Sequence, residues 1–425
     1  MKEMYKTFTK ILREELITAL GCTEPIALAL AGAKCIETLG EEPDSIEINV
    51  SGNIIKNVQG VIIPGTSQLK GIELSVLLGA VVKNSKKKLE VLSCLTTEQI
   101  DKAKALKDSG ICQINHIKGK PKLYIEVVMK KGDSYAIVEI MHQHTNITRI
   151  SKNGENIIYN PCQEEEFNSA LTDRSLLSIK NILDYASNVE IDEIKPFLSS
   201  QVSNNLNIAT EGFNNDFGLS TGRILLENAN GSVKERMKAF ASSGSDARMS
   251  GCDLPVVINS GSGNQGLTIS SPVYSYCKDL HISEDRMYRA LVVANLIPIH
   301  LKTRIGRLSA FCGAVTAGIG VGTALTYLAG GTNKQIGDTI KNSLANLTGV
   351  ICDGAKPSCA IKIASSVDAA YMAHQLAMKG KVVESGTGII YGNIEDTIKN
   401  MAEIAHDAMV ETDDMILKIM LAKEN

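Results

Sequence analysis

The sequence predicts an α+β protein: a mainly helical domain with an inserted α/β domain. Strand and helix patterns alternate from residue 45 to about residue 160, whereas after residue 165 strand signals nearly vanish and helical segments follow one another. We therefore expect N-terminal helices in residues 1–44 that pack on the helical domain, an α/β domain in residues 45–162, and the helical domain in residues 163–425.

The composition excludes several classes of protein. The chain has 425 residues, of which 44% are hydrophobic and 21% charged, so it can form two or three globular domains. The net charge is −3 and no basic stripe occurs, so nucleic acid is not an expected partner. The N-terminus is charged throughout and has no apolar signal segment, so we expect a cytoplasmic protein. The uncharged run 313–331 is mostly Gly, Ala and Thr, which favours a buried core helix over a membrane span, and we expect no membrane partner.

The N-terminal 40 residues predict two helices. Residues 1–20 are amphipathic, and residues 22–40 form an apolar run with helix signals at both ends. Thr23 can cap the second helix, Pro25 fits its first turn, and Gly40 can end it.

The next 110 residues alternate strand and helix signals. We expect strands in 45–52, 60–71 and 89–95, helices in 72–85 and 97–110, and a β-hairpin in 122–150 with "KKGDS" as its turn.

The remainder of the chain predicts helices that are separated by polar, glycine-containing loops. We expect them in 167–188, 192–209, 232–243, 284–300, 332–346, 360–379 and 394–422.

Three cysteines occur in two loops of the helical domain. Cys352 and Cys359 lie on either side of a short loop that carries Gly354 and Pro357, and Cys312 lies forty positions upstream. A chain without secretion signals keeps its thiols reduced, so disulfides are not expected. Three thiolates could hold three irons of a [4Fe-4S] cluster and leave the fourth open to substrate. Zinc sites favour closer pairs such as CxxC, and neither CxxC nor the ferredoxin spacing occurs. The spacing alone leaves a cluster, zinc and buried packing thiols as alternatives.

A fourth cysteine precedes the second helix. Cys22, in "GCTEP", lies where the free N–H groups and the helix dipole favour a thiolate or an anionic ligand. Plain capping by Thr23 would explain the same stretch.

The run "NSGSGNQGLT" contains the outline of a dinucleotide fingerprint. Gly261, Gly263 and Gly266 have the G-x-G-x-x-G spacing, but strand and helix do not alternate around them and Pro272 interrupts the following segment. A polar loop that offers N–H groups to a small carboxylate is an alternative, as is a surface loop.

Other polar residues are weaker candidates. "SGN" and "IIPGTSQLKG" offer Asn53, Thr66 and Ser67 as donors. "MHQHTN" places His142 and His144 on one face of a strand, where exposed histidines are more common than a metal site. Among Lys302, Arg304 and Arg307, one cation could meet a substrate carboxylate while another is solvated; this set lies just before Cys312.

Four motifs together resemble a known family. "GCTEPIALALAGA", "NSGSGNQGLT", "LSAFCGAVTAG" and "CDGAKPSCAIKIA" are similar to the bacterial and archaeal L-cysteine desulfidases, within the iron–sulfur serine dehydratase alpha-chain superfamily, over essentially the whole chain. The resemblance implies that Cys312, Cys352 and Cys359 ligate a [4Fe-4S] cluster with one open iron in a helical catalytic domain. It also implies that Cys22 acts there as a base or a transient iron ligand.

The implied reaction is a carbon–sulfur lyase reaction, the α,β-elimination of L-cysteine to pyruvate, ammonia and sulfide. In this scheme Thr23, Asn53, Ser262 and Asn264 bind the small amino-acid substrate, and the helix N-terminus lowers the pKa of Cys22. No pyridoxal phosphate is expected, because no lysine has a convincing Schiff-base context. A homodimer is compatible with the resemblance.

Two alternatives remain at this point. One is an L-serine dehydratase with the same cluster chemistry. The serine dehydratases have His where this chain has Cys22, and their last cysteine has no counterpart after Cys359, so the departure favours cysteine as substrate. The other is a non-catalytic metal- or thiol-binding protein.

Overall fold

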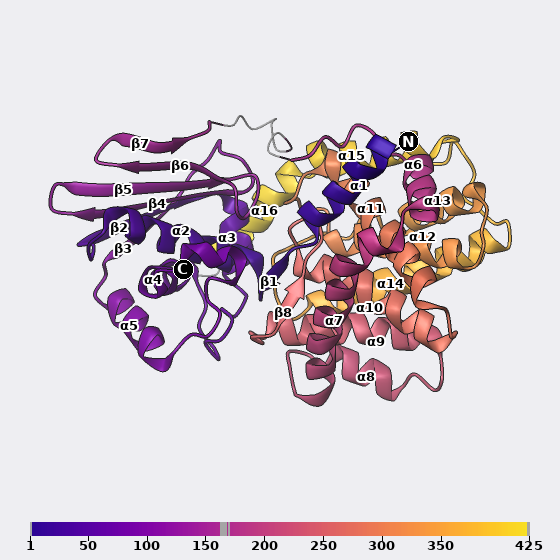
Figure 1. Cartoon of the computed structure of the whole chain (residues 1–425), viewed down its shortest axis with the longest axis horizontal. Coiled ribbons are helices and arrows are strands. Elements are labelled where there is room, and N and C mark those ends of the chain that lie inside the picture. The colour runs from indigo at the N-terminus through magenta and orange to yellow at the C-terminus, as the bar shows by residue number, and fades with distance from the viewer. Residues whose placement is uncertain (1, 162–167, 169–170, 423–425) are drawn as a thin grey trace.

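The computed structural model describes residues 2–161, 168 and 171–422. The chain is 59% helical with 12% strand, which confirms the expected α+β class with helix predominating. A six-stranded sheet with its helices lies beside a larger helical body (Figure 1). The start of the helix expected in 167–188, and Cys162, lie outside the described residues.

The sheet has the strand order β3-β2-β4-β5-β6-β7. All neighbouring strands are antiparallel except β2 and β3, which are parallel. Its strands are β2 (Ser45–Val50), β3 (Cys112–His116), β4 (Tyr124–Lys131), β5 (Ser134–Met141), β6 (Ile147–Lys152) and β7 (Glu155–Tyr159). Alternate residues of β2 are buried, as a strand with one face on a core requires.

The sequence predicted this part of the chain unevenly. The expected hairpin is confirmed, with Lys131 opposite Ser134 beside the turn. The expected strands in 60–71 and 89–95 are wrong. The first stretch contains Pro64, which lacks an N–H, and two glycines with positive φ, so it forms turns. The second follows a 3₁₀ helix, η1 (Ser85–Glu90), and is held as a turn by buried apolar side chains that pack against the sheet's helices.

The two N-terminal helices pack on different cores. α1 (Lys2–Glu15) buries Phe8 and Leu12 in the core of the helical body, as expected. α2 (Thr23–Leu39) packs instead against β4, β5 and α4 (Ile72–Val82), which corrects the expectation that both helices pack on the helical body. The reason is that α2 is apolar on nearly all sides and needs cover all round. The domain boundaries themselves stay a prediction.

Two short strands link the N-terminal segment to the helical body. β1 (Thr18–Leu20) pairs antiparallel with β8 (Pro255–Val257), which lies just before the "NSGSGN" run. Two further helices complete the part around the sheet, α3 (Gly52–Val58) and α5 (Thr97–Asp108).

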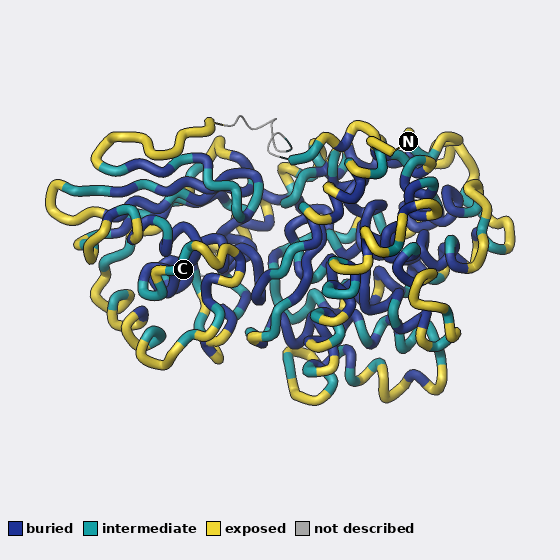
Figure 2. Tube along the Cα trace, in the orientation of Figure 1, coloured by how far each residue is buried: buried dark blue, intermediate teal, exposed yellow. Residues whose placement is uncertain are grey.

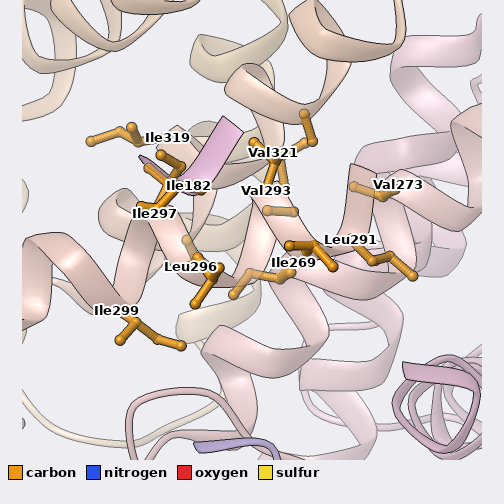
Figure 3. Close-up of a cluster of buried hydrophobic side chains, with 14 of the residues drawn as sticks. Ile182, Ile269, Val273, Leu291, Val293, Leu296, Ile297, Ile299, Ile319 and Val321 are labelled. Atoms are coloured by element: carbon orange, nitrogen blue, oxygen red, sulfur yellow. The ribbon is translucent and has the colours of Figure 1, made fainter. Parts of the chain in front are cut away.

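The helical body is built around α12 (Gly313–Leu328), which is almost wholly buried and contacts four neighbouring helices (Figure 2). Figure 3 shows side chains of α10, α11 and α12 interleaving in this core. Within the described residues, no helix has the combination of length and apolarity that crossing a membrane requires. The other helices of the body are α6 (Ile179–Asn188), α7 (Ile191–Asn214), α8 (Thr221–Glu227), α9 (Val233–Met249), α10 (Gly263–Asp279), α11 (Glu284–Ile305), α13 (Asn333–Leu347), α14 (Cys359–Met378), α15 (Ile394–Glu403) and α16 (Val410–Leu421).

The structure corrects two helix predictions here. α10 is a helix through Pro272, where a loop was the alternative considered, because its burial against α9 and α12 outweighs the one missing backbone hydrogen bond. The single helix expected in 394–422 is divided by a π-helical segment, Ile404–Ala408.

Two glycines let α2 and α4 approach closely, and one of them gives a stability prediction. A Cβ on Gly79 would lie 1.9 Å from the carbonyl oxygen of Ala29. We expect Gly79→Ala to lower the free energy of unfolding by about 1–3 kcal/mol through overpacking. The matched control is Gly337→Ala in α13, whose Cβ would meet only Ile394 at 3.9 Å; there we expect no loss, or a gain of up to about 1 kcal/mol. Urea denaturation midpoints measure both, and equal effects would contradict the packing account.

Candidate active site

A pocket lies where α2 and its neighbours meet the helical body. It holds about 790 Å³ of empty space, solvent at its mouth included. Cys22, Cys312, Cys352 and Cys359 all line it, although they are up to 337 positions apart in the chain. The structure therefore brings together the four cysteines that sequence analysis selected.

A backbone pairing brings two of the cysteine loops together. The N–H of Cys312 donates to the carbonyl of Val350 at 3.0 Å, and the N–H of Cys352 donates to the carbonyl of Ala310 at 2.6 Å. Phe311 and Ile351 form the isolated β-bridge between these bonds. This short antiparallel pairing fixes the two thiols beside each other.

The third cysteine is placed by a tight turn at the start of α14. Cys359 is the first residue of that helix, and its N–H donates to the carbonyl of Lys356 at 2.9 Å. Gly354 has φ 99°, and a Cβ there would lie 2.3 Å from the carbonyl oxygen of Lys56. The loop after Cys352 thus needs glycine at this position to pass so close to α3.

The three thiols interact electrostatically. Burial raises the pKa of Cys312 to about 12, and the neighbouring Cys352 and Cys359 thiols raise it further, while the α12 backbone acts in the opposite sense. Burial also raises the pKa of Cys359, with Cys352 contributing in the same direction. Such thiols are protonated alone and become thiolates when they bind a metal centre.

The donor set fits an iron–sulfur cluster better than one shared ion. Across the described part of the chain, no three His, Cys, Asp or Glu side chains converge closely enough to hold a single metal ion. A cluster asks for less convergence, because each thiolate binds a different iron. Three thiols that sense one another within one pocket meet that requirement.

Helix N-termini converge on the same pocket. Cys22 is the N-cap of α2, Ser262 that of α10, Cys312 that of α12, and Cys359 opens α14. The positive ends of these helix dipoles stabilise negative charge, whether on thiolates or on a bound carboxylate.

Cationic side chains add to this field. Arg248, Lys302, Arg307 and Lys362 line the pocket, whereas Arg304 is exposed. Burial lowers the pKa of Lys302 to about 8, against the opposite effect of the Cys352 and Cys312 thiols. These cations favour an anionic ligand.

The acidic residue of the pocket was missed by sequence analysis. Glu24 is buried; its Oε2 accepts hydrogen bonds from Cys22 Sγ and Thr23 Oγ1, both at 3.1 Å, and its Oε1 accepts one from Asn57 Nδ2 at 3.2 Å. His144 Nε2 lies 3.6 Å from Glu24 Oε1. Burial would raise the pKa of Glu24, but His144 and the hydrogen bonds lower it to about 2, so the carboxylate is ionised.

Two of these partners had visible signals in the sequence. Glu24 is part of "GCTEP", and His144 is part of "MHQHTN". The expectation that His142 and His144 are exposed strand residues is wrong, because both are buried just beyond the end of β5.

The state of Cys22 corrects a further expectation. Burial raises the pKa of its thiol well above the ordinary value, and the Glu24 carboxylate raises it more, while Arg248 lowers it. The helix N-terminus does not dominate, so the expected lowering is wrong. Thr23 is not the cap either: Cys22 is the N-cap, and the Thr23 hydroxyl donates to the carbonyl of Gly261 at 2.9 Å.

The expected substrate-binding residues divide into two groups. Thr23, Ser262 and Asn264 line the pocket. Asn53 does not: it lies one turn earlier on α3 than Asn57, which takes that place on the pocket wall.

The glycines of the "NSGSGNQG" run serve close packing. A Cβ on Gly263 would lie 2.3 Å from Arg248 Nε, and one on Gly266 would lie 2.0 Å from the carbonyl oxygen of Val257. A Cβ on Gly261 would come within 3.1 Å of the Arg307 and His144 side chains. The fingerprint spacing is thus explained by contacts within the protein.

A mainly helical α+β fold with this pocket of thiols, cations and helix N-termini indicates a lyase-type enzyme. The chain belongs to the serine dehydratase alpha chain family, whose model matches residues 86–418. The superfamily inferred from the four sequence motifs is thereby confirmed.

Relatives match over nearly the whole length. A UPF0597 protein of Lachnoclostridium phytofermentans is 48% identical over 418 residues, covering 98% of this chain and 100% of the relative. A UPF0597 protein of Fusobacterium nucleatum is 44% identical over 425 residues, covering 99% and 100%. One of Treponema denticola is 43% identical over 425 residues, covering 99% of each. The similarity therefore includes the segment with Cys22, which precedes the part matched by the family model.

The low pKa of Glu24 gives a pH prediction. An ionised Glu24 stabilises the fold fully above the ordinary glutamate pKa of 4.5, and this contribution is lost as the pH falls towards 2. The shift corresponds to about 3 kcal/mol at neutral pH. We expect the difference in unfolding free energy between wild type and Glu24→Gln to shrink by about 1 kcal/mol from about pH 7 to about pH 4. A pH-independent difference in urea midpoints would contradict an ionised Glu24.

Proposed function

We propose that this protein is a [4Fe-4S]-dependent L-cysteine desulfidase that eliminates sulfide from L-cysteine and yields pyruvate and ammonia. The observation that carries the proposal is the gathering of Cys22, Cys312, Cys352 and Cys359 in one pocket. Membership of the serine dehydratase alpha chain family supports the elimination chemistry.

Cys312, Cys352 and Cys359 would hold the cluster. Their backbones are fixed by the β-bridge and by the start of α14, so the donors are organised before any metal binds. When bound, the cluster supplies Lewis acidity and affinity for sulfur, which suit a thiol leaving group.

The pocket offers groups for the substrate carboxylate. Asn264 lies in the first turn of α10, and its Oδ1 is buried without a hydrogen-bond partner among the described residues. A buried unpaired amide is costly unless a ligand completes it. Thr23 and Ser262 lie beside it on the pocket wall, and Lys302 and Arg307 supply positive charge.

Cys22 would take the α-proton. In the elimination, the electron pair of the Cα–H bond forms the C=C bond, the C–S bond breaks, and sulfide leaves with its electron pair. The aminoacrylate product then hydrolyses to pyruvate and ammonia. Before that step Cys22 must lose its own proton, and the hydrogen bond from its Sγ to Glu24 Oε2 gives a path for it. The substrate ammonium group would lower the pKa of Cys22, in the same sense as Arg248 does.

L-serine is the alternative substrate, which the name of the matched family favours. Its leaving group is hydroxide, so the same pocket would carry out a dehydration. Turnover of L-serine that exceeds turnover of L-cysteine would select this alternative.

The cluster proposal predicts the effect of removing a ligand. Anaerobically purified wild type should be brown, absorb broadly near about 400 nm and contain iron and sulfide. Cys352→Ser should lose most of the iron and at least about 100-fold of the L-cysteine activity. The control is Cys94→Ser, which removes an exposed thiol away from the pocket and should change neither. Colourless wild type with stoichiometric zinc would instead favour a non-catalytic thiol protein.

The proposed base predicts a different pattern. Cys22→Ala should keep the iron and sulfide content of wild type while kcat for L-cysteine falls by about 100-fold or more, because general base catalysis contributes that much. Pyruvate release and metal analysis on the same sample measure both quantities. Full activity in this variant would remove Cys22 from the mechanism.

A further inference from the structure

We infer that Lys56 is a positioning residue that fixes the Cys352 loop, and that the C-terminal helix α16 holds Lys56 in place through Asp413. The inference rests on the proposed function, because the Cys352 loop matters only if it presents a ligand.

Lys56 is a fully buried lysine with two partners. It lies on α3, its side chain is 2% exposed, and its Nζ donates to the carbonyl oxygen of Cys352 at 3.1 Å. The same Nζ forms an ion pair with Asp413 Oδ1, whose side chain is also buried. Lysines are almost never buried unless they are paired, so this pair indicates a specific role for the charge at this position.

α3 lies between the cysteine loop and the C-terminal helix. On one side, Gly354 passes so close to Lys56 that a Cβ would lie 2.3 Å from its carbonyl oxygen. On the other side, a Cβ on Gly52 would lie 2.5 Å from a methyl carbon of Leu417 in α16. Any shift of α16 against α3 therefore moves the wall on which the loop rests.

The backbone around Cys352 is held at three points. Lys362 Nζ donates to the carbonyl of Ile351 at 2.9 Å, the Cys352 N–H is bound by Ala310, and the Cys352 carbonyl is bound by Lys56. The Cys352 side chain is only half-buried, so packing alone does not fix it. The direction of its Sγ depends on these backbone contacts, and Lys56 is the one that links it to another part of the chain.

The test compares thiol reactivity in the full-length protein. Iron is removed with a chelator under reducing conditions, and alkylation by N-ethylmaleimide is followed for each cysteine by peptide mass spectrometry. The variants are Lys56→Met and the double variant Lys56→Met/Asp413→Leu, which leaves no unpaired buried charge and keeps the test usable if the single variant does not fold. The control is Lys131→Met, which removes an exposed lysine paired with Asp44.

We expect Cys352 to react at least about tenfold faster in both variants, because local opening sets its reactivity. Cys35 and Cys277, buried elsewhere, should stay within about twofold of wild type, and Lys131→Met should leave all rates unchanged. In cluster-loaded protein the variants should also lose iron to a chelator faster. An unchanged Cys352 rate in the folded double variant, or an equal rise for all buried thiols, would overturn the inference.

This outcome is separable from the proposed function. Alkylation is measured without any cluster, so a protein that never binds iron can still show the loop effect. An active, iron-loaded enzyme with an unchanged Cys352 rate in the variants would refute the positioning role alone.

Discussion

The site depends on one short backbone pairing. Two reciprocal bonds, from Cys312 to Val350 and from Cys352 to Ala310, bring loops from different parts of the chain together. Without them, α12 and the loop before α14 would share a core but not a site. Because the bonds involve main-chain groups, they fix the Cα positions of both cysteines whatever their side chains do. Cys359 is then placed by the adjoining turn and the start of α14.

The same arrangement determines the electrostatics. Helices that begin at one pocket direct their positive ends into it, and buried Arg248 and Lys302 add full charges. Glu24 is the opposing charge, and it stays ionised because His144 and nearby donors compensate its burial. A thiolate-bound, net anionic centre and an amino acid carboxylate both suit this balance. The high pKa of Cys22 follows from the same low-dielectric setting, so its basicity has to be adjusted by whatever binds next to it.

Sequence reasoning found the features that are local. The buried α12, the β4–β5 hairpin and the four pocket cysteines follow from composition, periodicity and motif. It failed where tertiary contacts decide. The apolar stretch 60–71 became turns, and α2 packed on the sheet because its apolar surface extends nearly all round. Glu24 was read past because a glutamate in a first helical turn is ordinary, and only the fold shows that Cys22, Asn57 and His144 surround it.

The central claim is that a four-iron cage sits on three protein thiolates, with one iron free for substrate. Mössbauer spectroscopy of anaerobic, ⁵⁷Fe-enriched protein with and without L-cysteine tests it most directly. The account predicts a [4Fe-4S] spectrum in which about a quarter of the iron signal changes when L-cysteine binds, because one site differs from the other three. A spectrum with no cluster, or one whose irons are all unaffected by L-cysteine, would contradict it.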